Sequence, residues 1–302
     1  MGGRRGVRLE LDTINQLGYA LKYVLGLDRA GNNFTVFPDD TFIVSYPKSG
    51  NTWMRFLIGN LIYPEGVNFS NINQKILDPE DLSKRHLKRL PRPRYIKSHS
   101  PYDPRYRKVI LIVRDPRDVV LSEYHFDIKR NVIPESFPME RYVREWMDGR
   151  GYHESGSWGA NVGSWMAARR NVRAFLNGRS MLLLRYEDMI DDPNRELARV
   201  ATFLNIGSDE KRIRNAVERS SADQMRRMEQ AQSHLWSSTK HTRKDRPFVR
   251  AARSNGWKAE LPTRCALDIE SQWCTLIQEL GYCVSSACVV DTKTADSSDR
   301  ER

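Results

Sequence analysis

A run of anion-binding side chains stands where an apolar stretch is interrupted. The segment "FIVSYPKSGNTWMRFLIGNLIY", residues 42–63, begins as an apolar strand and ends as an apolar helix. The turn between them contains Lys48, Ser49, Gly50, Asn51 and Thr52. Gly50 permits close backbone approach, and the free N–H groups of a helix start attract an anion. An ordinary capped turn would explain Gly50 and Thr52 but not Lys48 or Trp53, so we favour an anion-binding loop.

The order of residues in this turn excludes the commonest triphosphate loop. The Walker A pattern GxxxxGK[ST] is absent, because Lys48 precedes Gly50. Kinases and NTPases also hold Mg²⁺, and no acidic residue stands in an obvious position for it. We therefore expect a donor that carries less charge at its reacting group, and we expect no metal, because lysines and helix N–H groups supply the positive charge.

Strands and helices alternate along the chain. Strands are predicted at 41–46, 94–98, 108–114 and 180–186; the third should be central and the fourth buried. Helices are predicted at about 52–63, 116–130, 158–176, 193–206, 209–221 and 263–282. This alternation predicts an α/β fold with a parallel sheet.

Polar groups follow each predicted strand, at the carboxyl end where open parallel sheets bind ligands. They are the Lys48 loop, Lys97-Ser98-His99, Arg114-Asp115 and Tyr186-Glu187-Asp188. Three of the four groups include a cation, so the ligand should be a polyanion.

Two segments together resemble a known family. "YPKSGNTW", followed about sixty residues later by "VRDPRDVVLSEYHF", is similar to the donor-binding signatures of the sulfotransferases that use 3′-phosphoadenosine 5′-phosphosulfate (PAPS), of the cytosolic type. "IKSHSP", "LRYEDM", "VERSSADQM" and "PFVRAARSNGWK" continue the resemblance in the family's order, over roughly residues 35–260. It implies a P-loop-like three-layer α/β/α fold with a central parallel sheet. It also implies transfer of a sulfuryl group from PAPS to a hydroxyl or amine, with PAP as the product.

The resemblance assigns donor-binding roles. The 5′-phosphosulfate would be wrapped by Lys48, Ser49, Gly50, Asn51 and Thr52. The adenine end would contact Trp53, Tyr186 and Ser220. The 3′-phosphate would be bound by Arg114, Ser122 and Arg250.

The catalytic residues that it implies are His99, Lys48 and Lys97. His99 follows Lys97 by two residues just past a strand, matching the family's Lys-x-His, and would be the base that takes the acceptor's proton. Lys97 would stabilise the sulfuryl oxygens and Lys48 the departing phosphate. His125, on a predicted helix, is the next candidate base.

The late loop departs from the family's pattern. Arg250-Ala251-Ala252 stands where Arg-Lys-Gly is usual, and Asn255-Gly256-Trp257 where Gly-Asp-Trp is usual. The lost lysine and glycine should weaken the hold on the 3′-phosphate. Ala222 stands where the family often places a phenylalanine against adenine. The Lys-Thr-Val-Glu dimer motif of animal members has no match here, so whether the protein forms a homodimer is left open.

Length, charge and cysteine content indicate the class of protein. The 302 residues carry a net charge of +11, which suggests anionic partners. We expect an N-terminal segment (1–35) packed on the domain through an amphipathic helix, a sulfotransferase domain (36–284) and a disordered tail (285–302). Neither a secretory signal nor an apolar run of about eighteen residues occurs, which predicts a cytoplasmic protein without stable membrane insertion. The four cysteines lack a metal spacing. A pair such as Cys283 and Cys288 could bridge, but free thiols are the favoured expectation.

Two alternatives stay open at this point. Basic runs at 83–97 and 240–258 would suit a nucleic-acid-binding protein, although no RRM, KH or zinc-finger signature accompanies them; we expect no nucleic acid partner. The second alternative is a nucleotide kinase on a related P-loop fold. The acceptor, a small molecule, glycan or natural product, should contact segments 64–93, 130–158 and 233–249. Aromatic residues in or beside these segments could line a pocket or belong to the core: Tyr63, Phe69, Phe126, Phe137, Trp146, Tyr152, Trp158 and Trp236.

Overall fold

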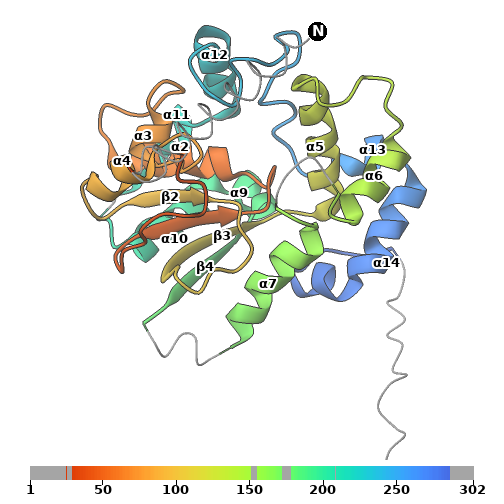
Figure 1. Cartoon of the computed structure of the whole chain (residues 1–302), viewed down its shortest axis with the longest axis horizontal. Helices are drawn as coiled ribbons and strands as arrows, with labels where there is room; N and C mark the ends of the chain where they lie inside the picture. Colours follow the sequence, from red (N-terminus) through yellow and green to blue (C-terminus); the bar gives the residue numbers. More distant parts are fainter. Residues whose placement is uncertain (1–24, 26–28, 151–154, 172–177, 208, 286–302) are drawn as a thin grey trace, which may run out of the picture.

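The computed structural model describes residues 25, 29–150, 155–171, 178–207 and 209–285. Its centre is a four-stranded sheet, in which every neighbouring pair of described strands is parallel (Figure 1). The strands, in sheet order, are β2 (Tyr95–Ser98), β1 (Thr41–Ser45), β3 (Lys108–Val113) and β4 (Ser180–Arg185). The predicted parallel α/β sheet is confirmed, and β3 is an inner strand as expected.

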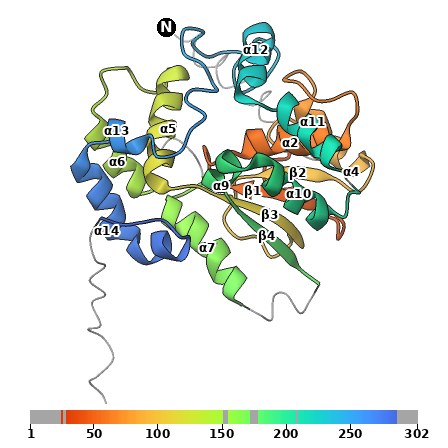
Figure 2. The same ribbon diagram turned by 180° about the vertical axis from the view of Figure 1, so that it is seen from behind.

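Helices cover both faces of the sheet (Figure 1; Figure 2). Because successive side chains of a strand point to opposite faces, Ile43 and Ile110 pack into one core, and Phe42 and Leu111 into the other. The first core is completed by α2 (Asn51–Ile62), α9 (Tyr186–Asp191), α10 (Pro193–Leu204) and α11 (Glu210–Arg219). The second is completed by α5 (Pro116–Lys129), α6 (Met139–Met147), α7 (Trp158–Arg170) and α14 (Thr263–Glu279). These layers confirm the three-layer α/β/α fold.

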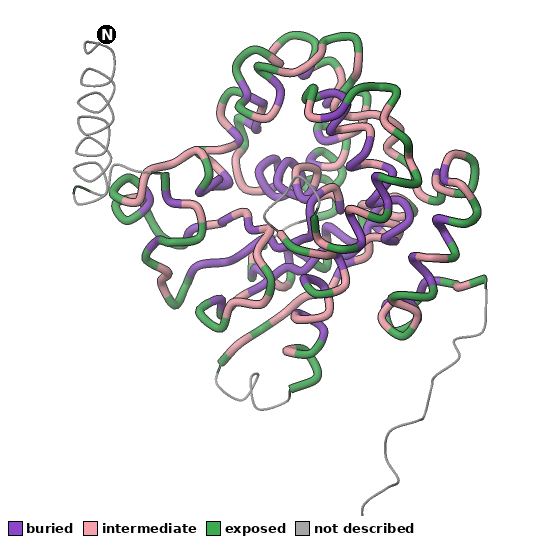
Figure 3. The backbone as a smooth tube through the Cα atoms, turned by 45° about the vertical axis from the view of Figure 1, so that its right-hand side comes forward, coloured by how far each residue is buried: buried purple, intermediate pink, exposed green. Residues whose placement is uncertain are grey.

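Most of the predicted helices are present with bounds close to those expected. The other helices of the described residues are α3 (Ile72–Lys75), α4 (Lys84–Arg89), α12 (Ala222–Gln232) and α13 (Trp257–Glu260). Buried backbone runs through the middle of the molecule and exposed backbone around its periphery (Figure 3). Within the part of the chain that the structure describes, no helix has both the length and the apolar character needed to cross a bilayer.

Helix α5 begins as its sequence indicates. Pro116 occupies the first turn, and the Asp115 carboxylate accepts a hydrogen bond from the Arg117 backbone N–H at 2.9 Å. The buried Arg117 guanidinium also pairs with Asp115 at 2.6 Å and with Glu270 of α14 at 2.5 Å. This network fixes the start of α5, directly after the polar end of β3, against α14.

Three expectations need correction. Strand β4 was expected to be buried, but Leu184 is its only buried residue. The strand is more exposed than expected because it lies at an edge of the sheet. An apolar run in the sequence does not distinguish an edge strand from a central one. The helix predicted over 158–176 ends at Arg170, where Asn171 turns to extended backbone. Cys274 is disulfide-bonded rather than free, and a spacing argument could not foresee this.

Other expectations keep their standing. Cys265 and Cys283 are free thiols, as predicted. The N-terminal helix and nearly all of the tail lie outside the described residues.

Candidate functional site

The Lys48 loop joins β1 to α2 in a conformation that needs its glycine. Lys48 and Gly50 both have left-handed backbone, with φ of 63° and 101°. A Cβ on Gly50 would lie 2.7 Å from Cδ2 of Tyr186, which follows β4. Among the described side chains none caps α2, so the first N–H groups of this helix are donors for an anion.

Gly50→Ala is expected to destabilise the fold more than an ordinary left-handed glycine substitution would. The backbone conformation alone costs an L-residue about 1–2 kcal/mol, and the contact with Tyr186 adds to that cost. Gly178→Ala is the matched control, because Gly178 has φ +72° and no described residue lies within 4 Å of its added Cβ. Denaturant unfolding measures both variants, and equal losses would contradict the close packing of the loop on Tyr186.

One side chain of the Lys48 loop holds it to β1, and another has a hydrogen-bond donor that no described residue accepts. The buried Asn51 amide donates to the Ile43 carbonyl at 2.9 Å and to Ser45 Oγ at 3.3 Å, which ties the loop to β1. Ser49 Oγ is buried and has no hydrogen-bond partner among the described residues. A buried hydroxyl without a partner is costly unless a ligand satisfies it, so Ser49 fits the predicted oxyanion contact. Thr52 is partly buried in the first turn of α2.

The Lys48 ammonium lies against two aromatic rings. Its Nζ is 3.6 Å from the ring centroid of Phe126 on α5 and 4.7 Å from that of Phe248. Removal from water lowers the pKa of Lys48 to about 7, although the negative charge of Glu123 opposes this shift. The aromatic faces favour the charged form. Lys48 is thus a cation whose charge responds to a neighbouring anion near neutral pH.

Arg114 connects three segments at the carboxyl edge of the sheet. From the end of β3 its Nη1 donates to the Lys48 carbonyl at 3.0 Å, and its Nη2 donates to the Arg253 carbonyl at 3.3 Å. The guanidinium lies 4.3 Å from the ring centroid of Tyr186. Its Nε is buried and has no partner among the described residues. Ser122, the other predicted ligand here, is partly buried about two turns into α5.

The residues predicted to contact adenine come together. Trp53 Nε1 donates to the Ser220 carbonyl at 3.0 Å, and the rings of Trp53 and Tyr186 meet edge to face at 6.0 Å. Ser220 is fully buried; its hydroxyl donates to Ala216 and accepts from Asn60 at 2.9 Å. The Ser220 hydroxyl is therefore engaged by the protein. Trp53 and Tyr186 lie together, and their contact with adenine stays a prediction.

His99 follows β2 beside the end of β1. Its Nδ1 lies 2.8 Å from the Ser45 carbonyl oxygen. A carbonyl can only accept, so Nδ1 carries the hydrogen and Nε2 carries the lone pair in the neutral ring. This tautomer suits a general base acting through Nε2.

The other predicted catalytic side chains are held by carboxylates. Lys97 Nζ pairs with Asp78 at 3.0 Å and with Glu80 at 3.3 Å. Its contact with a sulfuryl group stays a prediction. His125 Nε2 bonds to Glu260 at 3.1 Å.

The late loop bends through left-handed residues. Ala252 has φ of 48° where the family has glycine, and Asn255 has φ of 60°. The Asp118 carboxylate on α5 accepts the backbone N–H groups of Asn255 and Trp257, at 2.7 and 2.9 Å. Arg250 Nη1 binds Glu260 at 2.9 Å. The loop therefore keeps its turn without the glycine and lies against α5.

Two buried carboxylates near Lys48 were missed in the sequence. Glu123 accepts from Trp146 Nε1 at 3.0 Å, and Asp127 accepts from the Tyr142 hydroxyl at 2.6 Å. Burial and the neighbouring Asp127 raise the pKa of Glu123 to about 8. The available signal was their spacing of four residues on a predicted helix, which places both carboxylates on one face.

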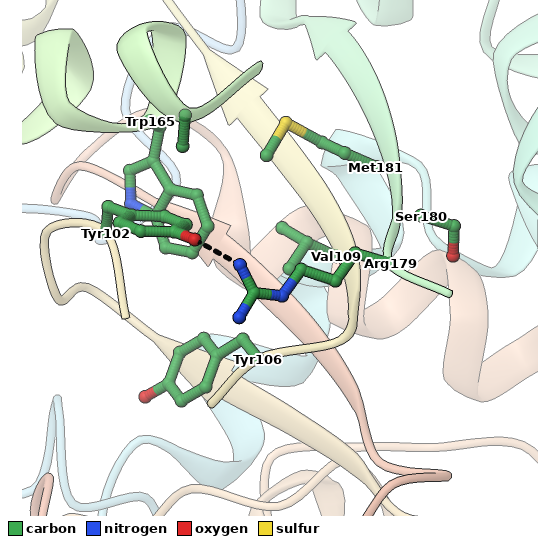
Figure 4. Close-up of a pocket in the computed structure, with 8 residues that line it drawn as sticks. Tyr102, Tyr106, Val109, Trp165, Arg179, Ser180 and Met181 are labelled. Atoms are coloured by element: carbon green, nitrogen blue, oxygen red, sulfur yellow. Dashed lines mark hydrogen bonds between the residues drawn. The ribbon is translucent and has the colours of Figure 1, made fainter. Parts of the chain in front are cut away.

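The aromatic residues of the variable segments prove mostly to be core. Four of them are buried: Phe69, Trp146, Trp158 and Trp236. Tyr152 lies outside the described residues. A small pocket does occur, but at the amino-terminal ends of β3 and β4, away from the Lys48 loop (Figure 4). Arg179 in this pocket donates to the Tyr102 hydroxyl at 2.6 Å and to the Pro104 carbonyl at 2.8 Å, so two of its N–H groups are used within the protein.

The chain resembles known proteins over most of its length. A family model described as the sulfotransferase domain matches residues 38–275. Mouse sulfotransferase 1A1 is 28% identical over 258 residues, which cover 79% of this chain and 84% of that protein. Sulfotransferase 1B1 of the dog is 29% identical over 206 residues, covering 63% and 67%.

Solved structures show the same fold. Mouse sulfotransferase SULT7A1, complexed with PAP, superposes with a TM-score of 0.64 at 22% identity, covering 81% of this chain and 86% of that one. Retinol dehydratase, in complex with androsterone and PAP, gives 0.63 at 18% identity and covers 84% of each chain.

These matches confirm the resemblance seen in the sequence and favour neither a kinase nor a nucleic-acid-binding protein. The matched region includes the Lys48 loop, His99 and Arg114, which the fold places at the carboxyl edge of one sheet. The chain belongs to the sulfotransferase domain family.

Proposed function

We propose that the protein transfers a sulfuryl group from PAPS to a hydroxyl or amine of a small-molecule acceptor. The observation that carries the proposal is the hydrogen bond from Arg114 to the Lys48 carbonyl. This bond joins the N-terminus of α2 and its Lys48 to a second cation, Arg114, which follows the adjacent strand β3. Two anion-binding groups in contact suit a nucleotide that bears phosphate at both its 5′ and 3′ positions.

The proposed reaction is an in-line displacement at sulfur. The acceptor oxygen or nitrogen forms a bond to sulfur, while the bond from sulfur to the bridging phosphate oxygen breaks. The acceptor's proton passes to Nε2 of His99. The electron pair of the broken bond stays on the 5′-phosphate of PAP, where Lys48 and the α2 N–H groups stabilise the negative charge.

The lowered pKa of Lys48 gives this residue a role that depends on the donor. A lysine with a pKa near 7 is only partly protonated in the free protein. A phosphosulfate oxyanion at the loop would favour its protonated form. Lys48 would then carry its full charge when the leaving phosphate needs it.

Nucleotide binding tests the proposal directly. We expect PAP to raise the melting temperature of the protein more than ATP with Mg²⁺ or a short DNA duplex does, because binding to the folded state stabilises it. Larger stabilisation by ATP with Mg²⁺ would indicate a kinase. Larger stabilisation by DNA would indicate a nucleic-acid-binding protein, and either result would reject the proposal.

Arg114→Ala is expected to raise the KM for PAPS and to blur the distinction between PAPS and adenosine 5′-phosphosulfate, which lacks the 3′-phosphate. A charge-assisted hydrogen bond contributes roughly 1.5–3 kcal/mol, so discrimination should fall about tenfold or more. Steady-state kinetics with both donors measures the ratio. Full retention of the preference would mean that Arg114 only fastens the Lys48 loop to the Arg253 carbonyl.

The described residues contain no group of three or more His, Cys, Asp or Glu side chains placed to hold a metal ion. We propose a mechanism that uses none, because lysines and helix N–H groups supply the positive charge. Turnover that persists in excess EDTA is the expected result. A homodimer stays a prediction that the measured mass in solution would test.

A further inference from the structure

Two arginines of the late loop converge on one oxyanion. Arg250 Nη1 lies 3.0 Å from Glu260 Oε1, and Arg253 Nη2 lies 3.3 Å from the same oxygen. Two guanidinium groups that contact one carboxylate oxygen are close enough to share a phosphate, which offers three oxygens. Sequence comparison gave a role to Arg250 and none to Arg253.

The Glu260 carboxylate is ionised in this arrangement. Partial burial would raise its pKa, but hydrogen bonds from Arg250 and His125 outweigh that effect and lower it. Glu260 therefore supplies one negative charge to the two loop arginines. A terminal phosphate carries between about 1.5 and 2 negative charges at neutral pH and has more acceptor oxygens, so it can replace the carboxylate on both.

The backbone places these arginines beside the predicted 3′-phosphate ligands. Arg114 Nη2 donates to the carbonyl of Arg253 at 3.3 Å. Asp118 holds the backbone of Asn255 and Trp257 on α5, one turn before Ser122. The Arg253 side chain is 58% exposed, so it can reorient toward a ligand without breaking a buried contact.

We propose that Arg253 is a donor-binding residue that, with Arg250, forms the loop half of the 3′-phosphate site. It supplies the second loop cation at a place where Ala251 has replaced the family's lysine. Glu260 is the internal counterion of the pair, which the 3′-phosphate displaces. This inference rests on the proposed function, because it requires a nucleotide with a 3′-phosphate.

Calorimetric titration of PAP and of adenosine 5′-phosphate, which lacks the 3′-phosphate, tests the inference. Arg253→Ala should weaken PAP binding by about three- to tenfold. This is less than the usual contribution of a charge-assisted hydrogen bond, because the Arg253 side chain is exposed to solvent. The variant should leave adenosine 5′-phosphate binding nearly unchanged. Alanine keeps the carbonyl that Arg114 contacts, so a loss reports on the guanidinium. Arg253→Lys should restore most of the preference for PAP. Arg264→Ala removes a charge at an 83% exposed arginine of α14 and controls for net charge.

Glu260→Gln distinguishes a competing carboxylate from an orienting one. If the 3′-phosphate displaces Glu260, this variant binds PAP more tightly than the wild type, by a few fold, and adenosine 5′-phosphate about equally. Weaker PAP binding would overturn the displacement.

The wild-type protein separates the two levels of failure. No preference for PAP over adenosine 5′-phosphate in the wild type would reject the proposed function itself. A wild-type preference that Arg253→Ala leaves unchanged would overturn the role of Arg253 alone.

Discussion

Lys48→Ala is expected to leave a folded protein with turnover reduced by about 10²–10³, the usual cost of losing one preorganised group that stabilises charge in the transition state. Lys48 lies in a loop, so its removal takes away charge rather than core packing. Its loss also removes the ammonium that lies over the rings of Phe126 and Phe248. Sulfuryl transfer and circular dichroism measure the two halves of this expectation.

The surface lysine Lys211 on α11 provides the matched control, because Lys211→Ala removes the same charge at an exposed position. Near-normal turnover in folded Lys48→Ala would remove this residue from the mechanism.

The lowered pKa of Lys48 gives a second, independent readout. With a pKa of about 7, most of the Lys48 ammonium is deprotonated at pH 8 in the free protein. The 5′-phosphate of PAP would favour the protonated form, so binding at pH 8 should take up a proton. Calorimetry in two buffers of different ionisation enthalpy measures this uptake, and Lys48→Ala should abolish most of it. Binding of PAP to the wild type without proton uptake would contradict the placement of Lys48 beside the 5′-phosphate.

His99→Ala is expected to reduce turnover by about 10²–10⁴ for an acceptor hydroxyl of high pKa, because removing a general base has effects of this size. The loss should be much smaller for an acidic phenol that is already partly ionised. PAP binding should survive, since the donor contacts come from the Lys48 loop and Arg114. In the wild type, kcat/KM should fall on acidification, because only a neutral imidazole accepts a proton and histidine titrates between about pH 5 and 8.

His241→Ala, which alters an exposed histidine of the late segment, serves as the control. An equal and small loss with both acceptors would mean that His99 only shapes the site. The next candidate base would then be His125, whose Nε2 already bonds to Glu260.

The sequence predicts where most of the candidate site residues lie, because they follow strands. The apolar runs of β1 and β3 identify buried strands, and parallel strands bring their carboxyl ends to one edge. Lys48 and Arg114 therefore had to approach each other, and the structure joins them by a hydrogen bond. The sequence indicated that Gly50 permits close backbone approach, and in the structure a Cβ at this position would lie 2.7 Å from Tyr186.

Contacts between distant segments could not be predicted in the same way. No local pattern indicates that Phe248 packs against Lys48, or that Glu260 binds Arg250, since these pairs depend on how a long loop returns to α5. Helix α6 was missed because its segment was treated as a variable loop, although Tyr142 and Trp146 have helical spacing and are buried.

The most direct measurement is transfer of labelled sulfuryl from PAPS to pools of phenols, alcohols, amines and glycans. We expect a labelled organic product together with an equal amount of PAP. Both should nearly disappear in Lys48→Ala for every acceptor, and in His99→Ala for acceptors of high pKa, while acidic phenols should keep much of their labelling in His99→Ala. If PAP binds but no pool is labelled, the proposed donor site would stand and the proposed sulfuryl transfer would be rejected. Label transfer that is undiminished in both variants would contradict the assignment of the reacting centre to Lys48 and His99.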